Sequence, residues 1–414
     1  MATIAVLGTL DTKGAEHAFI AHEIRKHGHE TLMIDVGTGA PATVAHQITR
    51  EEVAAAGEID LNAVLARQDR GESVAAMAKA APVLLQQLVK EGGIQGVVSL
   101  GGGGGTAIAT AAMRALPVGF PKLMISTLAS GNTEHYVGTK DIVMMPSIVD
   151  VSGLNRISRT IFTRGAGAIC GMVESKVDAT EDKPIIVASM FGNTTQCVEE
   201  ARIILEQAGY EVLVFHSTGS GGRCMESLIE SGLVVGVLDI TATEWADELV
   251  GGVLSAGPHR HEATGKAKLP AIVVPGCLDM VNFGEPETVP SKFAGRTFYH
   301  HNPQVTLMRT NQEECAKLGR ILAEKINAYT APVTVLLPLK AISVISAPGQ
   351  SFHDTAADEA LFKGIKDHLR SDIPVIEQDA EINDPAFAKA CAEALLHSLE
   401  GQAPSRAHFR PCGL

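Results

Sequence analysis

The stretch VVSLGGGGGTAIATAAM spans residues 97–113. Its β-branched start predicts a buried strand over 95–100, and its alanine-rich end predicts a helix over 106–116. A buried strand that runs through a short turn into a helix is typical of the βα unit of a parallel sheet. We therefore expect this stretch to lie at the carboxyl edge of such a sheet, where α/β proteins bind their ligands.

The glycine run itself predicts an anion site. Glycines allow the backbone to approach a ligand closely, and the helix that follows adds unpaired N–H groups and the positive end of its dipole. We expect nucleotide phosphates to bind at Gly101, Gly102, Gly103, Gly104, Gly105 and Thr106. No lysine follows as in a Walker A motif, and the GxGxxG fingerprint is absent. The alternative is a tight turn required only for packing, but five glycines exceed what a turn needs.

Outward from this stretch, β-branched runs alternate with helical periodicity along the whole chain. In the first half, strands are expected over 4–7, 31–34 and 122–125, and helices over 15–26, 73–89 and 153–172. In the second half, strands are expected over 185–190, 211–215, 234–238, 271–274 and 333–337. Helices there are expected over 195–207, 223–231, 355–369 and 385–399.

A charged stretch at 175–183, followed by Pro184, interrupts this alternation and is the best linker candidate. The predicted fold class is α/β, with two tandem Rossmann-like domains, mainly parallel sheets, and domain bounds of 1–178 and 183–414. The span 275–303 has few helical or strand signals. Its Cys, Asp, Asn, Arg, Tyr and His content favours a long, ordered functional loop.

Three further first-half segments should meet the glycine run at the same sheet edge. Lys13 could neutralise a phosphate, Asp11 could hold Mg²⁺, and Thr9 lies in the same turn. Asp35 ends the second strand, where an acid can bind ribose hydroxyls. Ser130 and Gly131 follow the fourth strand. Each segment alone is equally compatible with a solvated turn or helix cap, so the prediction depends on their co-occurrence.

The second half has its own cluster of imidazoles and carboxylates in glycine-rich loops, which includes the run His259, Arg260 and His261. Residues of these types perform acid–base chemistry or bind metals. The candidate catalytic residues are His216, Asp239, Glu244, His300 and His301. Their spacing fits no zinc motif, so no metal ligands are assigned, and phosphate or carboxylate binding is favoured over metal binding.

The composition excludes several classes of protein. A formal net charge of −13, with no Lys/Arg run, argues against a nucleic-acid or membrane-surface partner. Seven scattered cysteines without CxxC spacing suit reduced thiols. The start MATIAVLG is typical of a first strand, and no apolar stretch reaches the ~18 residues of a membrane span. We therefore expect a cytoplasmic protein.

Several motifs carry a resemblance to a known family. They are GTLDTKG (8–14), the glycine loop ending in Thr106, GTKDI (138–142), MFGNTT (190–195), FHSTG (215–219), DITATE (239–244) and HNP (301–303). Together they resemble the family named for the N-terminal ATP-binding region of the tomato mosaic virus resistance protein (Tm-type), over essentially the whole chain. The resemblance implies two Rossmann-like domains, ATP in the first, and a homodimer or higher homo-oligomer.

Three functions follow as hypotheses. The first is an ATP-dependent enzyme, with Mg²⁺, acting on a small anionic metabolite in a cleft between the domains. The second is a non-catalytic ATP-binding module that docks on a protein partner. The third is a metal-dependent hydrolase centred on His216, His259, His300 and His301.

Overall fold

The computed structural model describes residues 1–176 and 182–400. These residues form two compact units, the first from residues 1–176 and the second from residues 182–400. Each unit is described by itself. The expected linker over 175–183 and the last fourteen residues of the expected second domain fall largely or wholly outside the described residues.

The first unit is built on a five-stranded sheet in the order β2-β1-β3-β4-β5. Every neighbouring pair in this sheet is parallel. The strands are β1 (Thr3–Gly8), β2 (Glu30–Asp35), β3 (Gly96–Gly101), β4 (Lys122–Ser126) and β5 (Val143–Pro146). The helices are α1 (Leu10–Lys26), α2 (Arg50–Ala56), α3 (Leu61–Ala66), α4 (Arg70–Lys90), α5 (Gly103–Arg114), α6 (Glu134–Val137) and α7 (Arg156–Glu174).

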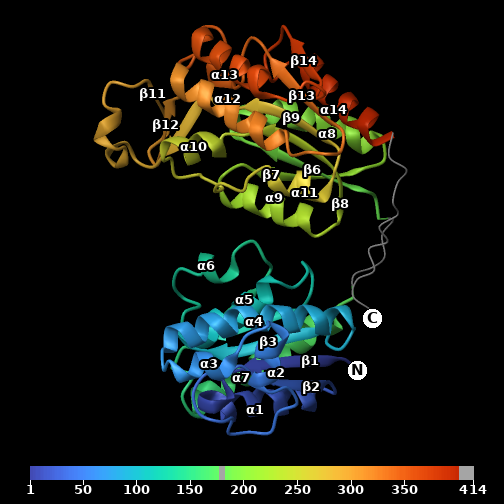
Figure 1. The fold of residues 1–414 in the computed structure, drawn as a ribbon, viewed down its shortest axis with the longest axis vertical. Helices are drawn as coiled ribbons and strands as arrows, with labels where there is room; N and C mark the ends of the chain where they lie inside the picture. Colours follow the sequence, from blue (N-terminus) through green and yellow to red (C-terminus); the bar gives the residue numbers. More distant parts are fainter. Residues whose placement is uncertain (177–181, 401–414) are drawn as a thin grey trace. The chain divides into compact units, whose positions relative to one another are not determined.

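Two hydrophobic layers enclose this sheet. Alternate side chains of β1 point to opposite faces, as strand geometry requires. Ala5 and Leu7 join the layer that includes α4 and α5, whereas Ile4 and Val6 join the layer that includes α1 and α7. Figure 1 shows α4 and α5 on one side of the strands and α1 on the other. The result is a three-layer α/β/α unit.

The second unit is built on a six-stranded parallel sheet in the order β14-β13-β9-β8-β6-β7. The strands are β6 (Ile185–Met190), β7 (Glu211–His216), β8 (Val234–Thr241), β9 (Ala271–Gly276), β13 (Val333–Pro338) and β14 (Val375–Gln378). Helices α8 (Thr195–Gln207) and α14 (Pro385–Glu400) cover one face. The other face packs on α9 (Ser220–Glu230), α10 (Glu244–Val250), α11 (Glu262–Ala267), α12 (Gln312–Ile326) and α13 (Thr355–His368). The α/β fold with two parallel sheets is thereby confirmed.

The expectation of a long irregular loop over 275–303 is wrong. This span contains β10 (Met280–Phe283), β11 (Phe298–Asn302) and two short 3₁₀ turns, Pro286–Thr288 and Ser291–Phe293. With β12 (Val305–Arg309), the two strands form an antiparallel sheet in the order β10-β12-β11. Both missed strands are only four or five residues long and mix polar with apolar side chains, so their periodicity is too short to detect.

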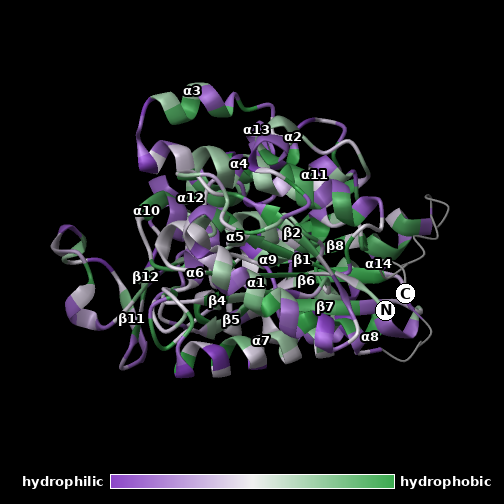
Figure 2. Cartoon of the chain, turned by 90° about the horizontal axis from the view of Figure 1, so that it is seen from below, coloured by the Kyte–Doolittle hydropathy of each residue, from purple (hydrophilic) through white to green (hydrophobic). Residues whose placement is uncertain are grey.

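Helix starts also differ from the predicted ones. Helix α5 begins at Gly103, so most of the glycine run is its first turn rather than a loop. Helix α4 begins at Arg70, after the cap Asp69, whose Oδ1 accepts the Glu72 N–H at 2.8 Å. In Figure 2 the sheet strands near labels β1 and β6 are green, whereas α7 alternates purple and green along its length. Within the described ranges, no helix combines the length and apolarity needed to cross a membrane.

Candidate functional site

The glycine turn between β3 and α5 presents free backbone donors. Gly101 ends β3 beside Ser126 of β4, and Gly102 is the helix N-cap. No side chain caps α5. Among the described residues, the N–H groups of Gly103, Gly104 and Gly105 have no hydrogen-bond acceptor. Three adjacent donors and a helix dipole therefore face the same point, which is the arrangement that binds phosphate.

The surroundings of these glycines show what each one is needed for. A Cβ on Gly101 would lie 3.2 Å from Gly105 Cα, which is tighter than ordinary contact. A Cβ on Gly102 or Gly105 would have no neighbour closer than 3.6 Å, one on Gly104 would meet Val74 at 3.4 Å, and one on Gly103 would meet nothing within 4 Å. None of the five has a positive φ. Packing therefore explains Gly101 alone, and the other four leave open space along the backbone.

Thr106 does not face this open space. Its side chain is fully buried and its hydroxyl lies 2.7 Å from Ser126 Oγ, which also accepts the Leu128 N–H at 3.0 Å. The hydroxyl therefore links α5 to the end of β4. Ser130 and Gly131 follow in the same β4 loop, where both are exposed.

Two carboxylates tie together the loops after β1 and β2. Asp35 is buried, and its Oδ1 accepts the N–H groups of Leu10 at 3.1 Å and Gly37 at 2.8 Å. Burial raises the pKa of the Asp35 carboxyl. Asp11 Oδ2 accepts the Gly39 N–H at 2.9 Å. Asp35 and Asp11, both predicted ligand residues, thus order the loops at the carboxyl edge of the sheet. Because both hydrogen bonds to Asp35 end on its Oδ1, its Oδ2 can accept a hydrogen bond from another donor.

Two cationic side chains lie at this edge. Lys13 interrupts α1 with φ −126°, and its carbonyl oxygen lies 2.7 Å from His17 Nδ1. The Thr9 carbonyl accepts the Lys13 N–H at 2.8 Å. Arg70, at the start of α4, places its Nη2 4.0 Å from the position of a Cβ on Gly104. Within the described chain neither Lys13 Nζ nor the Arg70 guanidinium has an acidic partner, so both can attract an anion.

His17 packs beside β1 and β3, next to the end of β3 where the glycine turn begins. A Cβ on Gly8 would lie 2.1 Å from His17 Nε2, so glycine at position 8 lets the ring pack against β1. The Leu100 N–H approaches the same nitrogen at 3.4 Å, which makes Nε2 the acceptor and Nδ1 the protonated nitrogen that donates to Lys13. Burial lowers the pKa of His17 and keeps the ring neutral.

In the second unit, the predicted catalytic carboxylates surround a buried arginine. Arg260 donates to both oxygens of Asp239 at 2.7 Å, to Glu244 Oε2 at 2.8 Å and to Glu226 Oε1 at 3.0 Å. Arg260, Asp239 and Glu244 are each about 1 % exposed. Burial alone would raise the pKa of Asp239, but the adjacent Arg260 lowers it to about 2. A carboxyl this acidic is a weak general base at neutral pH, and the geometry gives Asp239 and Glu244 the role of holding Arg260.

Glu244 also fills the glycine turn between β7 and α9. Its Oε1 accepts the N–H groups of Gly219 at 2.7 Å and Gly222 at 3.1 Å, at the amino end of α9. A Cβ on Gly222 would lie 2.1 Å from Glu244 Oε2. This turn is an anion site whose anion is a side chain of the same chain.

His261, which belongs to the predicted second-half cluster but was not among the candidate catalytic residues, lies beside this network. Its Nδ1 accepts the Trp245 indole N–H at 2.9 Å, and its Nε2 lies 3.3 Å from Asp239 Oδ2 without an aligned hydrogen bond. Burial lowers the pKa of His261 to about 3, so the ring is neutral at pH 7.

The three predicted catalytic histidines are exposed, and among the described residues none of their rings makes a hydrogen bond or ion pair with the buried network. His216 ends β7 and stacks on Phe191, with ring centroids 5.3 Å apart. His300 and His301 lie on β11, where Tyr299 packs on Phe352. Phe191, Tyr299 and Phe352 belong to one small apolar cluster. Across the described residues, His, Cys, Asp and Glu side chains form no group of three or more arranged to hold a metal ion.

Two family models cover almost the entire chain. The N-terminal domain model of the uncharacterised protein family UPF0261 matches residues 2–178, and the C-terminal domain model of the same family matches residues 183–399. The chain belongs to the UPF0261 family.

Relatives of this UPF0261 chain include bacterial and plant proteins. A UPF0261 protein of Clostridium tetani is 49% identical over 399 residues, which are 96% of this chain and 99% of the relative. The tomato (Solanum lycopersicum) ToMV resistance protein Tm-1(GCR237) is 41% identical over 337 residues, 79% of this chain and 44% of the tomato protein. The resemblance to the Tm-type family is thereby confirmed. Among solved structures, a UDP-N-acetylglucosamine 2-epimerase from Rickettsia bellii is 11% identical, with a TM-score of 0.21 over 65% of this chain and 78% of the epimerase.

Sequence reasoning on this UPF0261 chain missed Arg70 and His17, and it placed Arg260 in the second-half cluster without giving it a role. Arg70 had a signal, because Asp69 and Glu72 have the spacing of a helix cap and place the helix start three residues earlier. His17 had no such signal, and nothing in the sequence pairs Arg260 with Asp239. Their contacts join segments that are far apart in sequence, such as Leu100 with His17 and Asp239 with Arg260.

Proposed function

We propose that the first unit binds ATP, with the phosphates on the N–H groups of Gly103, Gly104 and Gly105. The observation that carries this proposal is the open space beside the backbone at Gly102–Gly105. All four residues are glycine, although neither their φ angles nor the packing around them requires glycine. Glycine in a helix lowers stability by roughly 0.5–1 kcal/mol relative to alanine. A ligand that must approach the backbone gives these residues a reason to be glycine.

The charges around the turn also support a nucleotide. The cations of Lys13 and Arg70 would offset the phosphate charge, and Asp35 Oδ2 would accept a hydrogen bond from a ribose hydroxyl. Asp11, in the same segment after β1 as Lys13, would hold Mg²⁺, a hard cation that prefers oxygen ligands. ATP rather than another nucleotide is what the resemblance to the Tm-type region implies. These groups support the binding of ATP. They do not by themselves support its hydrolysis, because backbone N–H donors supply no general base.

The test is calorimetric titration of the full chain with ATP and Mg²⁺. The variant Gly103→Ala adds a methyl that meets no protein atom within 4 Å but lies where the phosphates would approach. We expect it to fold normally and to bind ATP at least ~10-fold more weakly, a loss of about 1.4 kcal/mol.

The matched control is Gly171→Ala. Gly171 is also a helical glycine with nothing within 4 Å of its Cβ position, but it lies near Val173, which packs on Gly96 at the opposite end of β3. Its ATP affinity should equal that of the unmodified chain. Absence of ATP binding in the unmodified chain would overturn the proposal, and equal affinity in Gly103→Ala would overturn the placement of the phosphates.

A further inference from the structure

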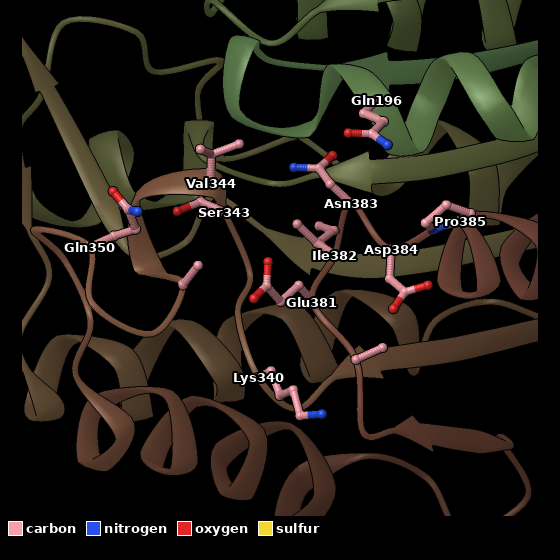
Figure 3. A pocket seen from close by; sticks show the side chains of 12 residues that line it. Gln196, Lys340, Ser343, Val344, Gln350, Glu381, Ile382, Asn383, Asp384 and Pro385 are labelled. Atoms are coloured by element: carbon pink, nitrogen blue, oxygen red, sulfur yellow. The ribbon is translucent and has the colours of Figure 1, made fainter.

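The second unit contains a cavity of about 500 Å³. It lies where the segments after β13 and β14 meet the amino end of α8. Figure 3 shows Gln196 and Asn383 on one side, Lys340 on the other and Glu381 between them. Its volume is in the range of small-molecule sites, and the carboxyl edge of a parallel sheet is where such sites occur.

Hydrogen bonds fix the walls of this cavity. The Lys340 N–H donates to the Ala380 carbonyl at 3.0 Å, which continues the pairing of β13 with β14. Asn383 joins these segments to α8, because its Oδ1 accepts the Cys197 N–H at 3.1 Å and its Nδ2 donates to the Asn193 carbonyl at 2.9 Å. Ser343 Oγ donates to the buried Asp279 Oδ2 at 2.6 Å. The cavity is therefore preformed.

Several polar groups in the lining keep free hydrogen-bonding capacity. Within the described residues, the Glu381 carboxylate and the Gln350 amide have no hydrogen-bond or ionic partner. Gln196 Nε2 donates to Glu200 at 3.0 Å, which leaves its Oε1 free. Lys340 Nζ lies 3.2 Å from Asp379, in a pair that is about half-exposed at the lysine. The lining thus offers both hydrogen-bond donors and acceptors, and the hydrogen bonds that fix the cavity walls do not use these groups.

We propose that this cavity binds a small uncharged polyol of the sugar class. A hydroxyl both donates and accepts, so a ring of hydroxyls can satisfy the Glu381 carboxylate, the two amides and the Lys340 ammonium at once. A phosphate is negatively charged and would be repelled by Glu381 and Asp384, which also lines the cavity. An ammonium compound only donates and would leave the amide N–H groups and Lys340 unpaired.

The amino ends of both nearby helices are already capped by the chain, which further disfavours an anion. Asn383 caps α8 at Cys197, and Asp384 Oδ1 accepts the Ala386 N–H of α14 at 2.8 Å. In this respect the cavity differs from the turn at Gly102–Gly105, where the helix N–H groups have no acceptor within the described chain. The inference does not depend on ATP binding, because every residue it uses lies in the second unit.

The test is saturation-transfer NMR and calorimetry on the full chain without nucleotide. The probes are ribose, glucose, myo-inositol and glycerol, with inorganic phosphate and putrescine as charged comparators. We expect at least one polyol to bind saturably with a millimolar Kd and to bind more tightly than either comparator. Glu381→Gln should weaken that binding about tenfold, the typical effect of losing a hydrogen bond to a charged group.

Two further variants keep the test decisive. Ala347→Phe, which would fill the cavity from its lining, should abolish binding while the far-ultraviolet circular dichroism stays unchanged. The control Glu393→Gln removes an exposed carboxylate of α14 that pairs with Lys389 at 3.6 Å, and it should leave the affinity unchanged. Failure of every polyol to bind, tighter binding of phosphate or putrescine, or full affinity in both Glu381→Gln and Ala347→Phe would each overturn the proposal.

Discussion

The two units each contain a glycine-rich turn from a parallel strand into a helix, but the turns use their backbone donors differently. At the β7–α9 turn, Glu244 accepts the N–H groups of Gly219 and Gly222. At the β3–α5 turn, the described chain supplies no acceptor for Gly103–Gly105. Glycines at the start of a helix therefore leave backbone donors for an anion, and residues distant in sequence decide whether the chain itself supplies that anion, as Glu244 does in the second unit.

The same contrast appears in the space around the glycines. At the β7–α9 turn, Gly219 has φ +80°, and a Cβ on Gly221 or Gly222 would lie 1.8 Å or 2.1 Å from a neighbouring atom. These glycines are required by the fold. Of the five glycines after β3, only Gly101 is required in this way. The first turn is thus open to a ligand, and the second is closed by the protein itself.

The largest expected effect comes from removing the internal anion of the second turn. Glu244→Ala leaves the Arg260 Nε and two buried N–H groups without an acceptor, and breaking such a buried pair costs about 3–5 kcal/mol. The chain has one tryptophan, Trp245, which lies in the second unit. Urea unfolding followed by its fluorescence should show this loss.

Glu248→Ala is the matched control, since Glu248 is an exposed carboxylate on the same helix. Its unfolding free energy should stay within about 0.5 kcal/mol of the unmodified chain. An equal small effect for Glu244→Ala would mean that the second turn does not depend on its internal carboxylate.

A medium effect is expected when one glycine from each turn is changed to alanine. Gly221→Ala places a Cβ 1.8 Å from the His216 carbonyl oxygen, and this overpacking should destabilise the second unit by about 1–3 kcal/mol. Gly104→Ala meets Val74 at 3.4 Å and the flexible Arg70 side chain at 4.0 Å, and should change stability by less than about 0.5 kcal/mol. Scanning calorimetry of both variants compares their losses of stability. Similar losses would show that the two turns are equally constrained.

The smallest expected effect concerns the charge beside the open turn. Arg70→Ala should weaken ATP binding about threefold at low salt and less at high salt, because an exposed charge acts through a screened field. Arg67→Ala is the control, since Arg67 pairs with Glu72 at 2.7 Å. Titration with ATP at two salt concentrations separates these results. If Arg70→Ala has no effect at low salt, Arg70 does not face the phosphates.

The sequence supports the prediction of both parallel sheets, because their strands are short, β-branched and separated by helical periodicity. It does not reveal the edge strands β5 and β14, which are only four residues long. Nor does it reveal the antiparallel strands β10, β11 and β12, which are four or five residues long and mix polar with apolar side chains. The glycine run after β3 was identified from local sequence alone. The partners of Asp239 and Glu244 could not be, since Arg260 lies sixteen or more residues away and meets them only in the folded sheet edge.

The open space along Gly102–Gly105 also affects how this protein can diverge. Exchange of any of these four residues for alanine or serine adds atoms where the chain itself has room, so such a substitution leaves the unit folded and alters only what approaches the backbone. A duplicated gene could therefore explore new ligands at this turn one residue at a time. The turn at Gly219–Gly222 has no such freedom, because a side chain on Gly219, Gly221 or Gly222 strains the backbone or meets neighbouring atoms and so lowers stability.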